Sequence, residues 1–280
     1  MTNQILEKSF TISGTARLEL NNIRGLVEIR PGADGVITVK AEKLVNTGDA
    51  GQTEIKMIQK EDGAVKVETR FPEDWLDVLF GSKPCKVNYV VTAPRVCALQ
   101  INGVSSSILT EGIEGDASFK TVSGEMTMRS LKGSLSFDTV SGRLQLSDLA
   151  GRLRLNTVSG DIKGTQLTGA LNLNTVSGDV GFERSSLPSV SANTVSGKVE
   201  LETDLGEGPY RFNSVSGNLV LKLPPNACCT TELQSMSGGL TISLPASSIT
   251  WKNGRQVADI QGGGVKVYLN SVSGNMEIGT

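Results

Sequence analysis

The residues that could do chemistry in this chain are few, and their spacing favours no reaction. The chain has no histidine, so the histidine-dependent nucleophiles and histidine metal sites of many enzymes are excluded. Cys228 and Cys229 are adjacent and lack the Cys-x-x-Cys spacing of a zinc site. Glycine-rich residues 262–267 precede an expected strand and not a helix, which argues against a phosphate cradle. The sequence therefore predicts a protein that is not an enzyme, with no catalytic residue, no cofactor and no metal.

A column of charged residues is the strongest remaining candidate for chemistry. One residue follows each glycine of a recurring turn, and the set reads Glu125, Arg143, Asp161, Asp179, Lys198 and Asn218. Asp161 and Asp179 form its only acidic pair, and some β-helix enzymes cleave polysaccharides with acidic groups on an outer face. We expect this pair to be exposed and solvated, which argues against catalysis. A carbohydrate-binding or polysaccharide-cleaving β-helix protein is the alternative function.

The elements that position these residues are set by a recurring phrase: a polar residue, Thr or Ser, Val, Ser and Gly. It occurs at residues 120–124, 138–142, 156–160, 174–178, 193–197, 213–217 and 270–274, and with Met236 in place of Val at 234–238. The closing glycines are 18, 18, 18, 19, 20, 21 and 36 residues apart. A period near 18 indicates one structural unit stacked on copies of itself.

Each 18-residue unit divides into two halves of nine residues. Gly115, Gly133, Gly151 and Gly169 lie midway between the glycines of the phrase. Each half reads apolar, x, apolar, x, x, apolar, x, Gly, which predicts a short strand with one buried face followed by a turn. This alignment places the Val of each phrase inside. It places Asn, Thr and Ser at corners, where their side chains can hydrogen-bond along the stack.

We expect these units to form an all-β solenoid, a parallel β-helix with rungs of about 18 residues. A meander of antiparallel hairpins is the alternative, but hairpins have no reason to recur at so constant a spacing. Residues 1–100 are β-rich but irregular and form an N-terminal part or cap, whose continuity with the solenoid is left open. Residues 101–280 form the regular solenoid, with a hairpin inserted near 249–260.

Three segments depart from the repeat and are the expected places for function. Residues 72–80 read as a short helix that caps the first rung or docks a partner, and its apolar side chains are Trp75, Leu76, Leu79 and Phe80. Asn253-Gly254 predicts a projecting hairpin that carries Trp251. The last strand, near residues 276–278, is expected to be uncovered and to allow self-association through the ends of the solenoid.

Charge and composition narrow the partners. The formal net charge is -2, and no dense cluster of Lys and Arg occurs, which argues against nucleic acid. The chain shows no apolar stretch of about 20 residues, so we expect no membrane span. No signal peptide is visible, so we expect the cytoplasm, with surface association by another route left open. Cys85, Cys97, Cys228 and Cys229 show no disulfide framework, and we expect free thiols.

The returning phrase, each time followed by x-apolar-x-apolar, resembles the bacterial "putative adhesin" β-strand-repeat family, a domain of unknown function. The resemblance covers at least residues 103–278, and the half-repeat at 25–29 extends it to most of the chain. It implies a right-handed β-helix and, in some members, an association with the cell surface or envelope. It carries over no catalytic residue.

These observations favour a non-enzymatic structural or interaction protein, an adhesin-like scaffold. The expected partner is a protein or an envelope component, with a glycan under the alternative function. The candidate partner-binding residues are Trp75, Leu76, Leu79, Phe80 and Trp251.

Overall fold

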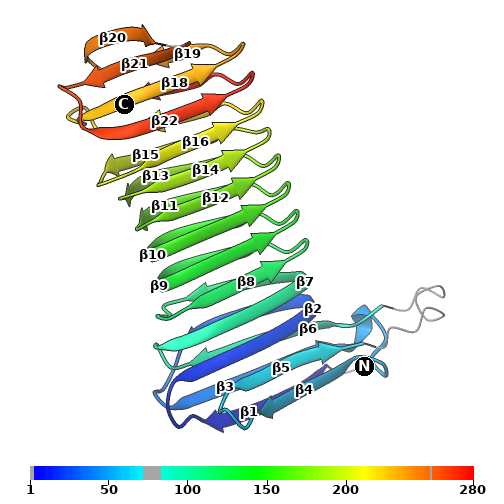
Figure 1. Ribbon diagram of the computed structural model, residues 1–280. Coiled ribbons are helices and arrows are strands. Elements are labelled where there is room, and N and C mark those ends of the chain that lie inside the picture. Colours follow the sequence, from blue (N-terminus) through cyan, green and yellow to red (C-terminus); the bar gives the residue numbers. More distant parts are fainter. Residues whose placement is uncertain (1–2, 72–82, 253) are drawn as a thin grey trace. The chain divides into compact units, whose positions relative to one another are not determined.

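The computed structural model describes residues 3–71, 83–252 and 254–280 of this chain. These residues contain 23 strands and one short 3-10 turn (Figure 1), so the expected all-β fold is confirmed. No helix among them has the length and apolar character needed to cross a membrane. The candidate helix at residues 72–80, with Trp75, Leu76, Leu79 and Phe80, lies outside the described residues. The chain divides into two compact units, Met1–Gly142 and Arg143–Thr280.

Unit 1, Met1–Gly142, has two layers of strands, and its long strands β2, β7 and β9 take part in both. Its elements are β1 (Gln4–Thr11), β2 (Ala16–Pro31), β3 (Val36–Leu44), the turn η1 (Val45–Thr47), β4 (Glu54–Gln59), β5 (Val65–Arg70), β6 (Lys86–Ala93), β7 (Cys97–Glu111), β8 (Ala117–Thr121) and β9 (Met126–Thr139). One layer runs β4-β5-β2-β7-β8-β9, and the other runs β1-β3-β6-β2-β7-β9. The stacked rings of Phe119 and Phe137, with centroids 5.4 Å apart, lie in the core between them.

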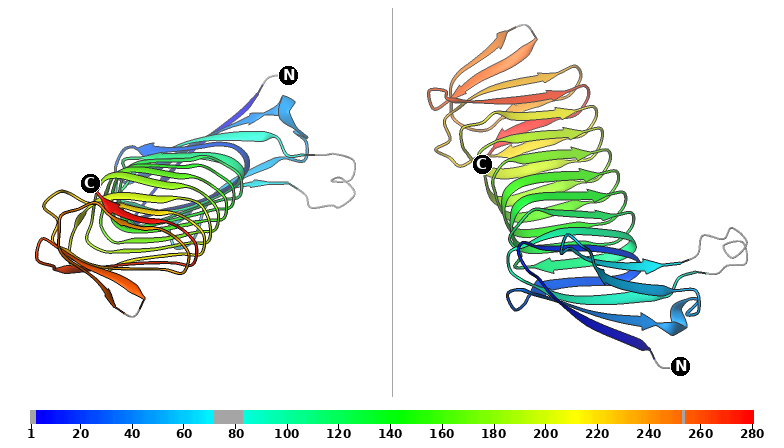
Figure 2. Two further views of the ribbon diagram at one scale, coloured as in Figure 1. Left: turned by 90° about the horizontal axis from the view of Figure 1, so that it is seen from above. Right: turned by 60° about the horizontal axis from the view of Figure 1, so that its bottom comes forward.

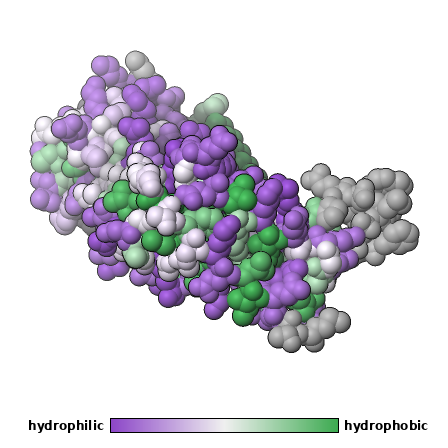
Figure 3. Space-filling model, turned by 90° about the horizontal axis from the view of Figure 1, so that it is seen from below, coloured by the Kyte–Doolittle hydropathy of each residue, from purple (hydrophilic) through white to green (hydrophobic). Residues whose placement is uncertain are grey.

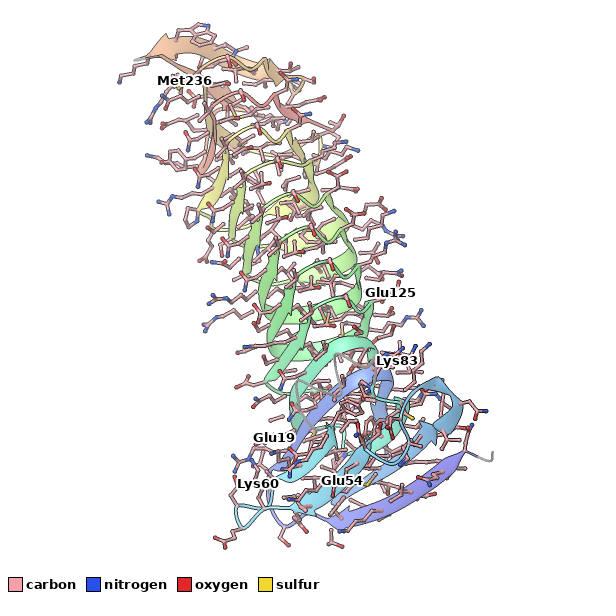
Figure 4. All side chains as sticks on the ribbon, turned by 90° about the vertical axis from the view of Figure 1, so that its right-hand side faces the viewer. Glu19, Glu54, Lys60, Lys83, Glu125 and Met236 are labelled. Carbon is pink, nitrogen blue, oxygen red and sulfur yellow. The ribbon has the colours of Figure 1, made fainter. Side chains whose placement is uncertain are left out.

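The surface of unit 1 mixes exposed apolar residues with ion pairs. Ile5 and Leu6 on β1 are 60% and 44% exposed. The view from below shows groups of hydrophobic residues interspersed with hydrophilic ones (Figure 3). Lys60 Nζ lies 2.6 Å from Glu19 Oε2, an ion pair between β2 and the residue that follows β4 (Figure 4). Exposed pairs of this kind contribute little stability.

Unit 2, Arg143–Thr280, stacks most of its strands in parallel, and only the pairs of β21 with β18 and with β20 are antiparallel among its described residues. Its strands are β10 (Leu144–Thr157), β11 (Ile162–Thr168), β12 (Leu171–Thr175), β13 (Val180–Leu187), β14 (Val190–Thr194), β15 (Val199–Leu205), β16 (Tyr210–Ser214), β17 (Leu219–Lys222), β18 (Cys229–Ser235), β19 (Leu240–Ile242), β20 (Ala246–Lys252), β21 (Arg255–Ile260), β22 (Val265–Ser271) and β23 (Met276–Gly279). Leu144 faces Ile162 and Leu153 faces Leu171, so each pairs with the equivalent residue of the next repeat. The strands form layers that face each other (Figure 2). Buried Leu, Val, Ile and Phe therefore form columns between these layers.

The stacking order in unit 2 departs from chain order at its C-terminal end. β16 pairs with β22 and β17 with β23. β22 in turn pairs with β18, and β23 with β19. The last two strands of the chain are therefore inserted between earlier ones. β22 lies between β16 and β18, and β23 lies between β17 and β19. The expectation of an uncovered last strand is wrong, because β23 has a partner along each of its edges.

Candidate functional site

The corners formed by the recurring phrase are built around a buried hydroxyl. Thr157 Oγ1 accepts a hydrogen bond of 2.9 Å from Gly160 N, and Ser214 Oγ accepts one of 2.7 Å from Gly217 N. Thr157 is 5% exposed, whereas the neighbouring Val158 is 46% exposed. The prediction that Val fills the inside is wrong, because Thr continues the alternation of its strand and takes the buried position.

The exposed apolar residues of these corners form a column in unit 2. The column comprises Val158, Val176, Val195, Val215, Val272 and Met236, between 45% and 83% exposed. Met236 is the most exposed (Figure 4). Single exposed valines are common on protein surfaces. The column is one side chain wide, so it offers a narrow stripe and not a broad patch.

Polar side chains at the same corners join successive repeats, as the sequence predicts. Asn174 Nδ2 donates to Asn156 Oδ1 at 2.9 Å, and Asn193 Nδ2 donates to Asn174 Oδ1 at 2.9 Å. Ser177 Oγ donates to Val158 O at 3.2 Å. The expected ladder of corner side chains is confirmed.

Asp161 and Asp179, the candidate acidic pair, are both exposed and serve the same ladder. Asp161 Oδ1 accepts from Asp179 N at 3.2 Å, and Asp179 Oδ1 accepts from Lys198 N at 2.8 Å. Each carboxylate therefore holds the backbone of the next repeat. This contact explains the acidic pair without a reaction.

The hairpin of β20 and β21 carries the one predicted partner-binding residue that the structure describes. Trp251 is 67% exposed and Ile249, two residues earlier, is 53% exposed. The two strands pair antiparallel, with Trp251 opposite Gln256 and Ile249 opposite Ala258. This pairing confirms the expected hairpin, although Asn253 lies outside the described residues.

The exposed apolar face of this hairpin is a continuation of the core face. Residues opposite each other in a sheet project to the same side, so Ile249 shares a side with Ala258, and Ala258 with its β18 partner Thr231. Ala258 and Thr231 are both 0% exposed. The core-facing side of the sheet therefore runs on into the hairpin and leaves Ile249 and Trp251 accessible.

A polar groove of about 640 Å³ lies along unit 2 at the corner opposite the recurring phrase. Its lining comes from β11, β13, β15 and β17, from residues 223–225 and from Thr280. It includes Thr168, Arg184, Ser186, Glu202, Asp204 and Lys222. Gln166 and Arg184 have positive φ values of 57° and 49°, which turn the chain without glycine. The two halves of a repeat are thus built differently, as the 18-residue period of two unlike halves indicated, but the sequence pattern did not indicate the groove.

Charges beside this groove are partly compensated by ion pairs. Glu200 accepts from Lys198 and from Lys222, with Lys222 Nζ 2.7 Å from Glu200 Oε1. The hydrogen bond from Lys198, then that from Lys222, lowers the pKa of the Glu200 carboxyl. The hydrogen bond to Glu200 raises the pKa of Lys222. Both groups are therefore held in their charged forms at neutral pH.

The four cysteines are all free. Cys97 and Cys229 are buried, and burial raises their thiol pKa values to about 12 and about 11. Protonated thiols of this kind are poor nucleophiles and poor metal ligands. No group of three or more potential metal-binding side chains occurs within residues 3–71, 83–252 and 254–280.

Together these features define an all-β repeat domain with a ladder of corner side chains, an apolar hairpin and a polar groove. The model of the Toastrack DUF4097 family matches residues 15–279, and the chain belongs to this family. The expected membership of a β-strand-repeat domain of unknown function is thereby confirmed. No curated protein matches the chain.

Solved bacterial structures resemble the chain at low identity. A "putative lipid binding protein" from Parabacteroides distasonis is 12% identical, with 99% of this chain and 96% of the other covered and a TM-score of 0.49. A "putative adhesin" from Bacteroides fragilis is 9% identical, with 98% and 97% covered and a TM-score of 0.40. A "putative cell adhesion protein" from Clostridium sporogenes is 11% identical, with 99% of each chain covered and a TM-score of 0.29. Likenesses of this strength carry no argument about what this chain binds.

Proposed function

We propose that this chain is a non-enzymatic scaffold that binds a protein or envelope partner through its C-terminal hairpin. In this proposal the repeats form a right-handed parallel β-helix whose rungs have the length of the sequence repeat. The pairing of each strand with the equivalent strand of the next repeat supports this rung length. The rigid stack then serves to present the hairpin at a fixed place.

The observation that carries this proposal is the accessible core face of the hairpin. Ile249 and Trp251 project from the same side of the sheet as fully buried residues of β18 and β21. Apolar side chains aligned on one face mark interaction sites more often than scattered ones do. Tryptophan is among the residues that contribute most binding energy when an interface buries them.

The test compares the full chain with the double variant Ile249→Ser/Trp251→Ala as bait in extracts of the native host. Val158→Ser is the matched control, because Val158 is an exposed apolar residue of a regular corner. We expect at least one protein or envelope component to bind the wild type and the control and to be lost with the double variant. Capture of the same components by all three baits would contradict a role for the hairpin.

The non-enzymatic part of the proposal has its own test. Purified chain is incubated with polysaccharides and the release of reducing sugar is measured. We expect no release above that of buffer. Turnover that disappears in Asp161→Ala/Asp179→Ala would show that the corner carboxylates are catalytic and would replace the scaffold by the alternative function.

A further inference from the structure

The polar groove of unit 2 is a second feature that the hairpin does not explain. We propose that this groove binds a neutral oligosaccharide that lies along the stacking direction of the strands. The geometry of its lining, the balance of its charges and the pairing of its strands support this assignment.

The groove has two rows of hydrogen-bonding side chains that follow the stack. In the first row Thr168 of β11 lies opposite Ser186 of β13, and Ser186 lies opposite Asp204 of β15. The second row includes Arg184, followed by Glu202 opposite Lys222. Neighbouring strands are about 4.8 Å apart, so the first row offers partners at regular steps, and Glu202 and Lys222 add one further pair at that spacing. A polymer of similar polar units fits such a periodic surface.

The chemistry of the rows suits hydroxyl groups. Arg184 and Lys222 can only donate hydrogen bonds, and the carboxylates of Glu202 and Asp204 can only accept them, whereas a sugar hydroxyl does both. Glu200, beside the groove, pairs with Lys198 as well as with Lys222. Within the lining, the positive charges of Arg184 and Lys222 balance the carboxylates of Glu202 and Asp204. The groove therefore has no excess positive charge to attract an acidic polymer, and the ligand class is neutral.

An extended peptide fits this groove less well than a sugar chain. β13 pairs with β11 on one side and β15 on the other, and β15 also pairs with β17. The lining strands therefore leave no open edge to which a peptide strand could be added. The apolar residues of the lining, Leu223, Pro224 and Pro225, are all at the β17 end, so they do not recur along the groove as the alternate side chains of a peptide would require.

The experiment is isothermal titration calorimetry of the full chain with cellohexaose, xylohexaose and the hexamer of N-acetylglucosamine. A galacturonic acid hexamer is the acidic comparison, and an extended polar hexapeptide is the peptide comparison. The groove variants are Arg184→Ala and, as a second position, Asp204→Ala. Arg154→Ala is the matched control, because Arg154 is an exposed arginine on β10 outside the groove lining. Thermal melting by circular dichroism checks that each variant folds.

We expect at least one neutral hexasaccharide to bind the wild type, and each groove variant to weaken binding about tenfold or more, the effect of losing one hydrogen bond to a charged group. Arg154→Ala and Trp251→Ala should leave sugar binding unchanged, so this result is independent of the hairpin. Absence of binding by all three neutral sugars would overturn the proposal. So would binding that neither groove variant weakens, or tighter binding of the acidic hexamer or the peptide.

Discussion

Each repeat of unit 2 turns twice, and its two corners differ in how much of their chemistry is already used. At the corner of the recurring phrase the hydroxyl caps a glycine N–H, the amide joins an amide ladder, and the glycine lies against the previous repeat. The opposite corner keeps a close glycine at Gly151 and Gly169 but has Pro188 at the next repeat. The groove opens along this second corner. At the corner of the recurring phrase, the polar side chains hydrogen-bond within the stack and stabilise it. At the opposite corner, the side chains vary from repeat to repeat and line the groove, where they can bind a ligand.

The largest difference between the two corners is expected when one carbon is added at the corner of the recurring phrase. A Cβ on Gly178 would lie 2.1 Å from Gly160 O, a backbone atom that cannot move without disturbing the stack. We expect Gly178→Ala to lower the free energy of unfolding by about 3 kcal/mol, as measured by urea denaturation followed by circular dichroism.

The control for this change is Gly181→Ala on β13, between the two corners. A Cβ there would meet nothing within 4 Å, so we expect a change within about 0.5 kcal/mol, or a slight gain from the stiffer unfolded chain. Equal losses at the two positions would show that the corner glycine is no more constrained than a strand glycine.

A smaller effect separates the two neighbours in the middle of the phrase. Thr175 is 4% exposed and accepts from Gly178 N at 3.3 Å, whereas Val176 is 45% exposed. Thr175→Val leaves a buried N–H without its acceptor, and we expect a loss of about 1–3 kcal/mol in the free energy of unfolding.

The matched change at the next residue is Val176→Thr, which swaps the same two side chains at an exposed position. We expect this variant to remain within about 0.5 kcal/mol of the wild type, measured by the same denaturation. If Val176→Thr were the more costly of the two, the burial pattern of the corner would be the reverse of the one described.

The repeated part of this fold could be predicted from sequence because its signal is periodic. Spacing alone indicated parallel pairs one repeat apart and the ladder of Asn174 and Asn193, and the structure has both. The assignment of Val158 to the inside failed for a physical reason. Val is more apolar than Thr, but the alternation of the strand and the need to cap Gly160 N decide in favour of Thr157.

The C-terminal order and the groove could not be predicted in this way. The placement of β22 and β23 depends on pairing across residues 223–264, and no local pattern specifies which strand is the neighbour. The groove is lined by residues that do not repeat, such as Arg184, Asp204 and Lys222. A periodic sequence pattern identifies the residues that all repeats share. It gives no information about positions at which each repeat has a different residue.

The smallest expected change in stability comes from the ion pairs of Glu200 with Lys198 and Lys222 on the outer face. These pairs belong to neither corner. The folded-state pKa of Glu200 is lowered by Lys198 and Lys222. The stabilisation from these pairs is therefore present above the unfolded pKa of Glu, about 4.3, and is lost as pH falls through the lower, folded pKa. We expect Glu200→Gln to be slightly less stable than the wild type at pH 7, by urea denaturation, and the difference to vanish in acid.

Glu207→Gln, at an exposed position beyond β15, is the matched control, and we expect its free energy of unfolding at pH 7 to stay within about 0.5 kcal/mol of that of the wild type. Because Glu200 is partly exposed, salt screening should also reduce the effect at high ionic strength. A Glu200→Gln difference that persisted unchanged below the folded pKa, or in high salt, would mean that packing and not charge holds this side chain. The outer face would then resemble the corner of the recurring phrase, where contacts within the stack fix the side chains. It would differ from the corner along the groove, where the side chains remain available to a ligand.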